Sequence, residues 1–136
     1  MASITLKSTL IKGLMAGLAA AIMNSALFYA FKNLGAINDT VQIMPGEPLG
    51  VHNAIISSII SSLIASIVYF VIAIFARDAF RIFQRIAWIM LLLSFFSPFL
   101  FIPEVPVGYA ISLNIMHIVV AAAVIYIMKK HIPFLR

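Results

Sequence analysis

The sequence contains no cysteine and very little charge. None of its 136 residues is Cys, so disulfides, thiolate catalysis and cysteine-based metal sites are excluded. Only 10% of the residues are charged, and four of them are acidic. No Asp or Glu lies inside a long apolar run. The chain therefore lacks the intramembrane carboxylate on which proton-coupled exporters usually depend.

Apolar sequence, by contrast, is abundant. Hydrophobic residues make up 64% of the chain, and the mean hydropathy is +1.15. A soluble domain of this size needs polar residues over most of its exterior, whereas these apolar runs are long enough to require lipid. We therefore predict an all-α, four-transmembrane-helix bundle that forms one membrane domain, residues 1–136. The predicted spans are about 13–31, 51–75, 82–102 and 109–128, and the Gly- and Pro-containing stretch 32–50 is predicted to be an outer loop.

The basic residues predict an orientation. Eight of the nine fall at one end of the predicted spans: Lys7, Lys12, Arg77, Arg81, Arg85, Lys129, Lys130 and Arg136. Lys32 alone falls at the other end, so the positive-inside rule places both termini in the cytoplasm. We expect a multi-pass protein of a bacterial inner (plasma) membrane. The basic residues form no aromatic-interleaved patch, so nucleic acid is not an expected partner.

Three of these arginines repeat every four residues. Arg77, Arg81 and Arg85 lie in the connection between the second and third predicted spans. A helix places residues at this spacing on one side. We expect that side to meet anionic lipid headgroups, because arginines commonly flank the cytoplasmic ends of membrane helices.

Small residues mark two faces for close helix packing. In the first span Gly13, Gly17 and Ala20 share a face, and Gly13 with Gly17 forms a GxxxG pair. In the second span Ser62 and Ser66 continue a four-residue repeat. A parallel stripe of Ser57, Ser61 and Ala65 lies beside that repeat. Each serine hydroxyl can bond to a carbonyl one turn earlier, or the serines can line a conduit, and the sequence leaves both interpretations open.

Polar residues also occur within the predicted spans at a common depth. At about 1.5 Å of rise per residue, Asn24, Ser58, Ser94, Ser97 and His117 lie about 9 to 14 Å below the outer ends. This polar belt comprises Asn24, Ser58, Ser94, Ser97, Asn114 and His117. Pro98 removes the backbone hydrogen bond to the Ser94 carbonyl, which predicts a kink in the third span.

Some of these residues also carry a family resemblance. Asn24, Ser94 with Pro98, and Met116 with His117 resemble the pattern of a bacterial family of four-span membrane proteins known only as a domain of unknown function. The resemblance covers most of the chain and implies the four-span architecture. It implies no activity, substrate or cofactor.

Two functional hypotheses remain open. In the first, the chain is a structural or accessory membrane protein whose polar belt fixes the register of the helices. In the second, it binds or transports a small molecule, lipid or ion through an outward-facing pocket near His117. Membrane lipids are the expected partners, and a homo-oligomer or another membrane protein is an open alternative.

Catalysis and cofactor binding find no support in the residue pattern. No nucleophile, base and orienting group recur together, so no catalytic residue is assigned. His52 lies near the outer surface, about 10 Å from the level of His117, so the two cannot easily ligate one haem iron or metal ion within a monomer. We therefore expect neither a cofactor nor a metal.

Overall fold

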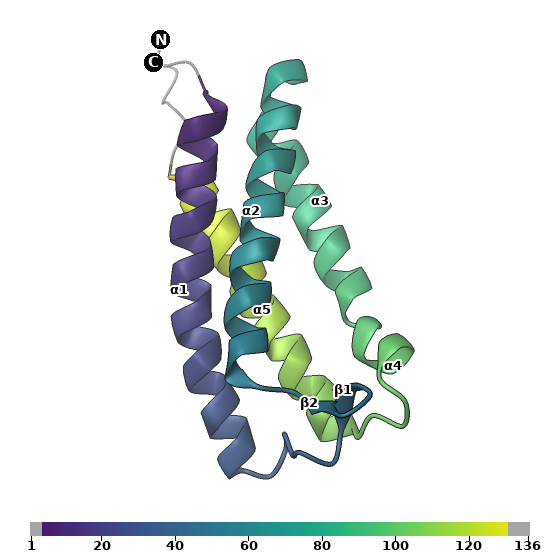
Figure 1. Cartoon of the computed structure of the whole chain (residues 1–136). Coiled ribbons are helices and arrows are strands. Elements are labelled where there is room, and N and C mark those ends of the chain that lie inside the picture. Colours follow the sequence, from purple (N-terminus) through teal and green to yellow (C-terminus); the bar gives the residue numbers. More distant parts are fainter. Residues whose placement is uncertain (1–3, 131–136) are drawn as a thin grey trace.

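The computed structural model describes residues 4–130. Arg136, which the sequence predicts to be cytoplasmic, lies outside this part of the chain. The all-α class is confirmed here, since only a hairpin of two short strands interrupts the helices (Figure 1). In chain order the elements are α1 (Leu6–Asn33), β1 (Gln42–Met44), β2 (Glu47–Pro48), α2 (Val51–Phe75), α3 (Ala79–Ser94), α4 (Ser97–Phe101) and α5 (Val107–Lys129).

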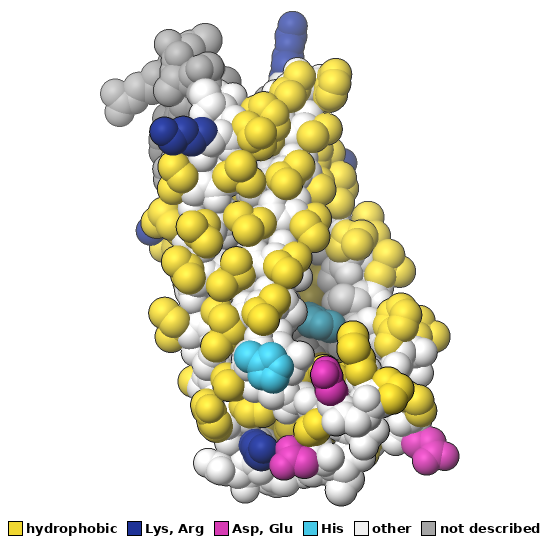
Figure 2. Space-filling view, in the orientation of Figure 1, with side chains coloured by type: hydrophobic (Ala, Val, Ile, Leu, Met, Phe, Trp, Pro, Cys, Tyr) yellow, Lys and Arg dark blue, Asp and Glu magenta, His cyan; other side chains and the backbone are white. Residues whose placement is uncertain are grey.

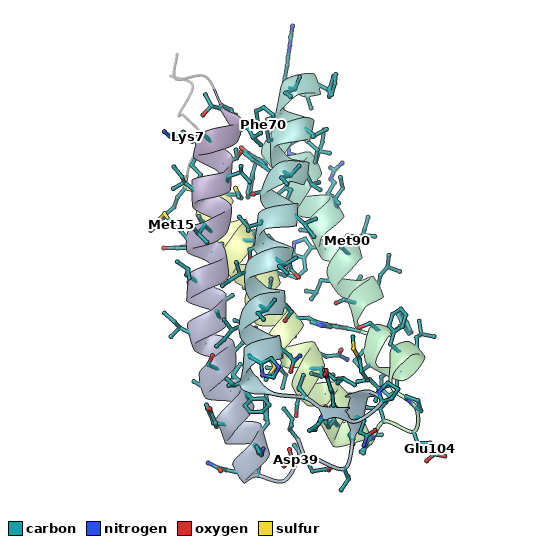
Figure 3. All side chains as sticks on the ribbon, in the orientation of Figure 1. Lys7, Met15, Asp39, Phe70, Met90 and Glu104 are labelled. Atoms are coloured by element: carbon teal, nitrogen blue, oxygen red, sulfur yellow. The ribbon has the colours of Figure 1, made fainter. Side chains whose placement is uncertain are left out.

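Three of the helices are long and apolar enough to cross a membrane. These are α1, α2 and α5, with 28, 25 and 23 residues. At about 1.5 Å per residue even the shortest of them exceeds the roughly 30 Å hydrocarbon core of a bilayer. Their outward side chains are apolar, as for Met15, which is 55% exposed and points away from the neighbouring helices (Figure 3). The chain is therefore a membrane protein.

The third predicted span is not one continuous helix. Its residues form α3 and the single-turn α4, separated by Phe95 and Phe96. Pro98 has no amide hydrogen to donate to the Ser94 carbonyl, and the amide of Phe99 bonds to Phe96 instead of Phe95. The proline thus breaks the helix, a larger effect than the kink expected from the sequence.

The predicted outer loop is folded onto the bundle. Helix α1 ends in a Schellman motif: Gly35 has a φ of 75°, its amide donates to Lys32, and the Ala36 amide donates to the Phe31 carbonyl. The next apolar residue, Ile37, is only 1% exposed. Pro45 and Gly46, with a φ of 82°, then form the turn between β1 and β2.

The two ends of the bundle differ in charge. At one end lie the start of α1, the α2–α3 connection and the end of α5, which together carry the basic residues (Figures 1 and 2). We call this the basic end. At the other, the loop end, lie Asp39 and Glu104 (Figure 3). Lys32 also lies there and is paired with Asp39 at 3.1 Å.

Two apolar clusters hold the helices together, one near each end. Near the loop end, Ile37 packs with Phe28, Tyr109 and Met116. Near the basic end, Tyr69 of α2 and Phe83 of α3 meet edge to face at 5.3 Å between ring centroids. Toward the loop end α3 leans away from α2 (Figure 1).

Candidate functional site

A cavity of about 550 Å³ lies where α3 leans away from α2, with α5 beside it. Figure 2 shows it as a hollow on the side of the molecule, bordered by hydrophobic side chains and with a histidine side chain inside. The lining comes from α1, α2, α3 and α5. Its polar members are Asn24, Asn53, Ser57, Ser58, Ser61, Ser94 and His117, and none of the lining residues among those described is charged.

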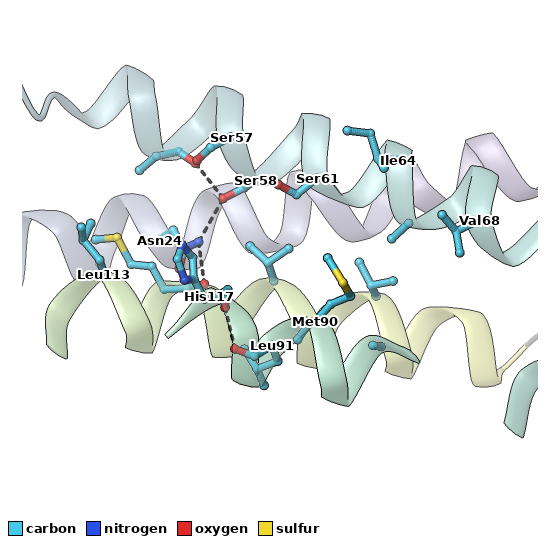
Figure 4. Close-up of a pocket in the computed structure, with 18 of the residues that line it drawn as sticks. Asn24, Ser57, Ser58, Ser61, Ile64, Val68, Met90, Leu91, Leu113 and His117 are labelled. Atoms are coloured by element: carbon cyan, nitrogen blue, oxygen red, sulfur yellow. Dashed lines mark hydrogen bonds between the residues drawn. The ribbon is translucent and has the colours of Figure 1, made fainter. Parts of the chain in front are cut away.

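Small residues create the room for this cavity. Ser57, Ser61 and Ala65 line it from α2, Ala87 lines it from α3, and Ala121 lines it from α5 (Figure 4). Small side chains on three facing helices leave space where Leu or Phe would fill it. The parallel stripe noted on the second span is therefore the α2 wall of the cavity.

Asn24 ties three helices together beside the cavity. Its Nδ2 donates to Ser58 Oγ on α2 at 3.0 Å and to the Met116 carbonyl on α5 at 3.2 Å (Figure 4). Ser58 in turn donates to the Ala54 carbonyl of its own helix at 2.7 Å. Both side chains are buried, so each hydrogen bond satisfies a polar group that would otherwise lack a partner in apolar surroundings.

A polar side chain of α5 bonds to the backbone at the break between α3 and α4. Asn114 Nδ2 donates to the Phe95 carbonyl at 3.3 Å, which α4 has left without its usual helical partner. The Ser94 hydroxyl donates to the Leu91 carbonyl at 2.7 Å. Ser97 begins α4 and is not among the residues that line the cavity. Five of the six belt residues thus bond to a neighbouring group or line the cavity, and Ser97 does neither within the described part of the chain.

His117 lies in the cavity wall. Ser94 of α3 lines the same cavity. The Nδ1 of His117 is buried and has no hydrogen-bond partner among residues 4–130, as is also true of Asn24 Oδ1. The ring therefore borders the open space with one nitrogen unsatisfied, unlike the amide nitrogen of Asn24.

The seam between α1 and α2 is tightly packed. A Cβ built on Gly17 would lie 2.9 Å from Ile59 Cα, and one on Gly13 would lie 2.5 Å from Ser66 Oγ. Ala20, Ser62 and Ser66 are fully buried. A larger side chain at either glycine would force the two backbones apart.

The three arginines named from the sequence stand at the basic end. Arg81 pairs with Asp78 across one helical turn at 3.1 Å, and both side chains are well exposed. Arg77 and Arg85 are also exposed. An exposed pair of this kind contributes little to stability, which leaves the arginines free to interact with their surroundings.

The model of a family of unknown function, DUF6069, matches residues 5–132. The chain belongs to this family. The match confirms the resemblance to an uncharacterised family that Asn24, Ser94, Pro98, Met116 and His117 indicated. No curated protein and no solved structure matches this DUF6069 member in the comparisons made.

Sequence reasoning missed the apolar half of the cavity. Phe83, Ile86 and Met90 of α3 line it opposite α2. Ala87 and Ala121 were the available signal, because small residues on two facing helices mark possible space. In the described part of this DUF6069 member, no three His, Cys, Asp or Glu side chains gather where they could hold a metal ion.

Proposed function

We propose that this protein binds an apolar small molecule in the side cavity between α2, α3 and α5. The observation that carries the proposal is the cavity itself, at about 550 Å³ with a lining that is mostly apolar and has a few polar groups. Binding sites for small molecules typically measure about 300 to 1,000 Å³ and have this composition. Its mouth faces sideways, so the molecule enters from the lipid (Figure 2).

The proposal includes four membrane crossings. Helix α3 has 16 residues and is about 24 Å long, too short for a bilayer core of about 30 Å. With Phe95, Phe96 and the five residues of α4 the segment reaches about 34 Å and connects the basic end to the loop end (Figure 1). The Phe95 carbonyl freed at its break accepts a hydrogen bond from Asn114 of α5, as membrane burial requires.

The proposed orientation places the basic end and both termini in the cytoplasm of a bacterium. The support is the charge asymmetry, with Arg77, Arg81 and Arg85 against anionic headgroups and Lys32 alone at the loop end. A reporter protein fused after Arg136 is expected to be active only in the cytoplasm. Activity of the fusion on the outer side of the membrane would reverse the orientation.

The binding proposal is tested with a matched pair of substitutions. Ala121 lines the cavity, while its neighbour Ala122 is exposed on the outside of α5. Native mass spectrometry of protein extracted in mild detergent should show a retained small molecule on the wild type and on Ala122→Phe. Ala121→Phe fills the cavity and should lose it. Equal retention by both variants, or none by the wild type, would contradict the proposal.

A second candidate function is structural or accessory, with the polar belt fixing helix register. The bonds of Asn24 to Ser58 and to Met116 favour this role for the part of the belt on α1 and α2. They do not account for the cavity beside them. We therefore assign the structural role to Asn24 and Ser58, and ligand binding to Ser94, His117 and the other residues that line the cavity. A homo-oligomer or a membrane partner is compatible with both roles.

A further inference from the structure

The polarity of the cavity changes along its length, and it changes in the same direction on α2 and α3. On α2 the lining is Asn53, Ser57 and Ser61 toward the loop end, then Ile64, Ala65 and Val68 toward the basic end. On α3, Ser94 lies nearest the loop end and Phe83 nearest the basic end. On α5, Leu113 and Met116 precede His117, and Val120, Ala121 and Val124 follow it. The polar groups of the cavity thus lie toward the loop end, and the part toward the basic end is apolar.

The length of the cavity matches a hydrocarbon chain. From Asn53 to Val68 the α2 wall is about 22 Å long at 1.5 Å per residue. The hydrocarbon of one leaflet is about 15 Å thick, half of the bilayer core. An extended chain of a lipid therefore fits along the wall, with the polar end of the cavity nearer the membrane surface on the loop side.

The polar end offers hydroxyl and amide groups and no charge. Ser57 and Ser61 are exposed there, and no Lys, Arg, Asp or Glu is found among the described residues of the lining. A phosphate or an ammonium group placed against these side chains would lose its hydration without gaining an opposite charge. An uncharged hydroxyl or ester can instead exchange hydrogen bonds with the serines.

We propose that the molecule bound in the cavity is an amphiphile, namely one hydrocarbon chain that carries an uncharged hydroxyl or ester group. This inference rests on the proposed function. The chain lies toward the basic end, and its polar group lies against Ser57 and Ser61. This chemistry has two sources in a membrane, namely one ester-linked chain of a glycerophospholipid or a separate neutral lipid such as a monoacylglycerol.

The test compares ligands of matched chain length on delipidated protein in detergent. The probes are monooleoylglycerol, which has a chain and hydroxyl groups, and 1-octadecene, which has the chain alone. Binding is followed by native mass spectrometry and by the rise in melting temperature. Loss of one or two hydrogen bonds corresponds to about tenfold in affinity. We expect monooleoylglycerol to bind about tenfold more tightly than 1-octadecene.

Substitutions identify the polar contacts. The double variant Ser57→Ala/Ser61→Ala should lower the affinity for monooleoylglycerol to that for 1-octadecene. Ser25→Ala is the control, because the Ser25 hydroxyl bonds only to the Ala21 carbonyl of α1 and lies outside the cavity. It should keep the tenfold difference. The same affinity of wild type for both probes would overturn the inference, as would an unchanged difference in the double variant.

The outcome separates this inference from the proposed function. If wild type retains a molecule of another class that Ala121→Phe loses, the proposal of binding in the cavity is supported and the proposal of an amphiphile is wrong. If Ala121→Phe and Ala122→Phe behave alike with every probe, binding in the cavity itself is wrong. Competition by dioleoylphosphatidylglycerol as strong as that by monooleoylglycerol would identify a phospholipid chain as the source, and weaker competition would identify a separate neutral lipid.

Discussion

Helix α2 presents two stripes of small residues that lie side by side and pack in opposite ways. The seam stripe, Ser58, Ser62 and Ser66, is fully buried against α1. The cavity stripe, Ser57, Ser61 and Ala65, borders open space in front of α3. Residue type does not explain the difference, because both stripes consist of small residues, mostly serine. The helices that face them differ.

Close packing requires small residues on both partners. Helix α1 packs Gly13 and Gly17 against the seam stripe. The two backbones lie so close that a Cβ at either glycine would overlap α2. Helix α3 faces the cavity stripe with Phe83 and Met90, and its broken end is bonded to α5 through Asn114 and the Phe95 carbonyl. One helix can therefore stabilise the fold with one stripe and leave room for a ligand with the next.

The largest effect is expected at the seam. Gly17→Leu places a branched side chain where even a Cβ would be 2.9 Å from Ile59 Cα. Overpacking of this kind costs about 3 kcal/mol. Ala30→Leu on the exposed side of α1 is the control and should be neutral. Thermal unfolding in detergent measures both, and equal melting temperatures would show that the seam is not closely packed in the membrane protein.

An intermediate effect is expected at the three-helix junction. Asn24→Leu removes the bonds to Ser58 and Met116 and leaves their oxygens facing an apolar group, at a cost of about 1 to 2 kcal/mol. Ser58→Ala should cost less, and the double variant should cost less than the sum, because the two side chains share a bond. Ser57→Ala, on the cavity stripe, should leave stability unchanged. Additive effects of the Asn24 and Ser58 substitutions would mean that the two do not interact.

The smallest effect is expected at His117. Its buried Nδ1 has no partner among the described residues, so His117→Leu removes an unsatisfied polar atom. Stability should therefore stay within about 0.5 kcal/mol of wild type or increase. Chemical unfolding of both proteins measures the difference. A loss as large as that of Asn24→Leu would assign His117 to the structural part of the belt.

Much of this arrangement could be predicted from the sequence because it depends on local chemistry. The apolar runs predict the membrane helices, since no other environment accepts their surfaces. The spacing of Gly13 and Gly17 predicts a face on which a helix can approach closely. Pro98 predicts the place where α3 is interrupted, because a residue without an amide hydrogen has this effect in any fold.

The cavity could not be predicted, because it depends on how helices distant in sequence are placed. The pattern at Ser57, Ser61 and Ala65 is the same as that at the seam, and only the angle of α3 makes it a cavity wall. The role of Asn24 likewise required the position of the Met116 carbonyl, a backbone group that no residue pattern marks. The fold of the loop around Ile37 depends in the same way on tertiary contacts.

The central claim is that neighbouring stripes of α2 have different functions, and one pair of adjacent serines tests it most directly. Ser61 and Ser62 receive the same substitution, leucine, and each variant is measured for thermal stability and for retention of the bound molecule. Ser62→Leu should strongly destabilise the protein, because Ser62 is fully buried beside Gly17. Ser61→Leu should keep the stability of wild type and lose the bound molecule. Equal loss of stability in the two variants, or full retention by Ser61→Leu, would contradict the account.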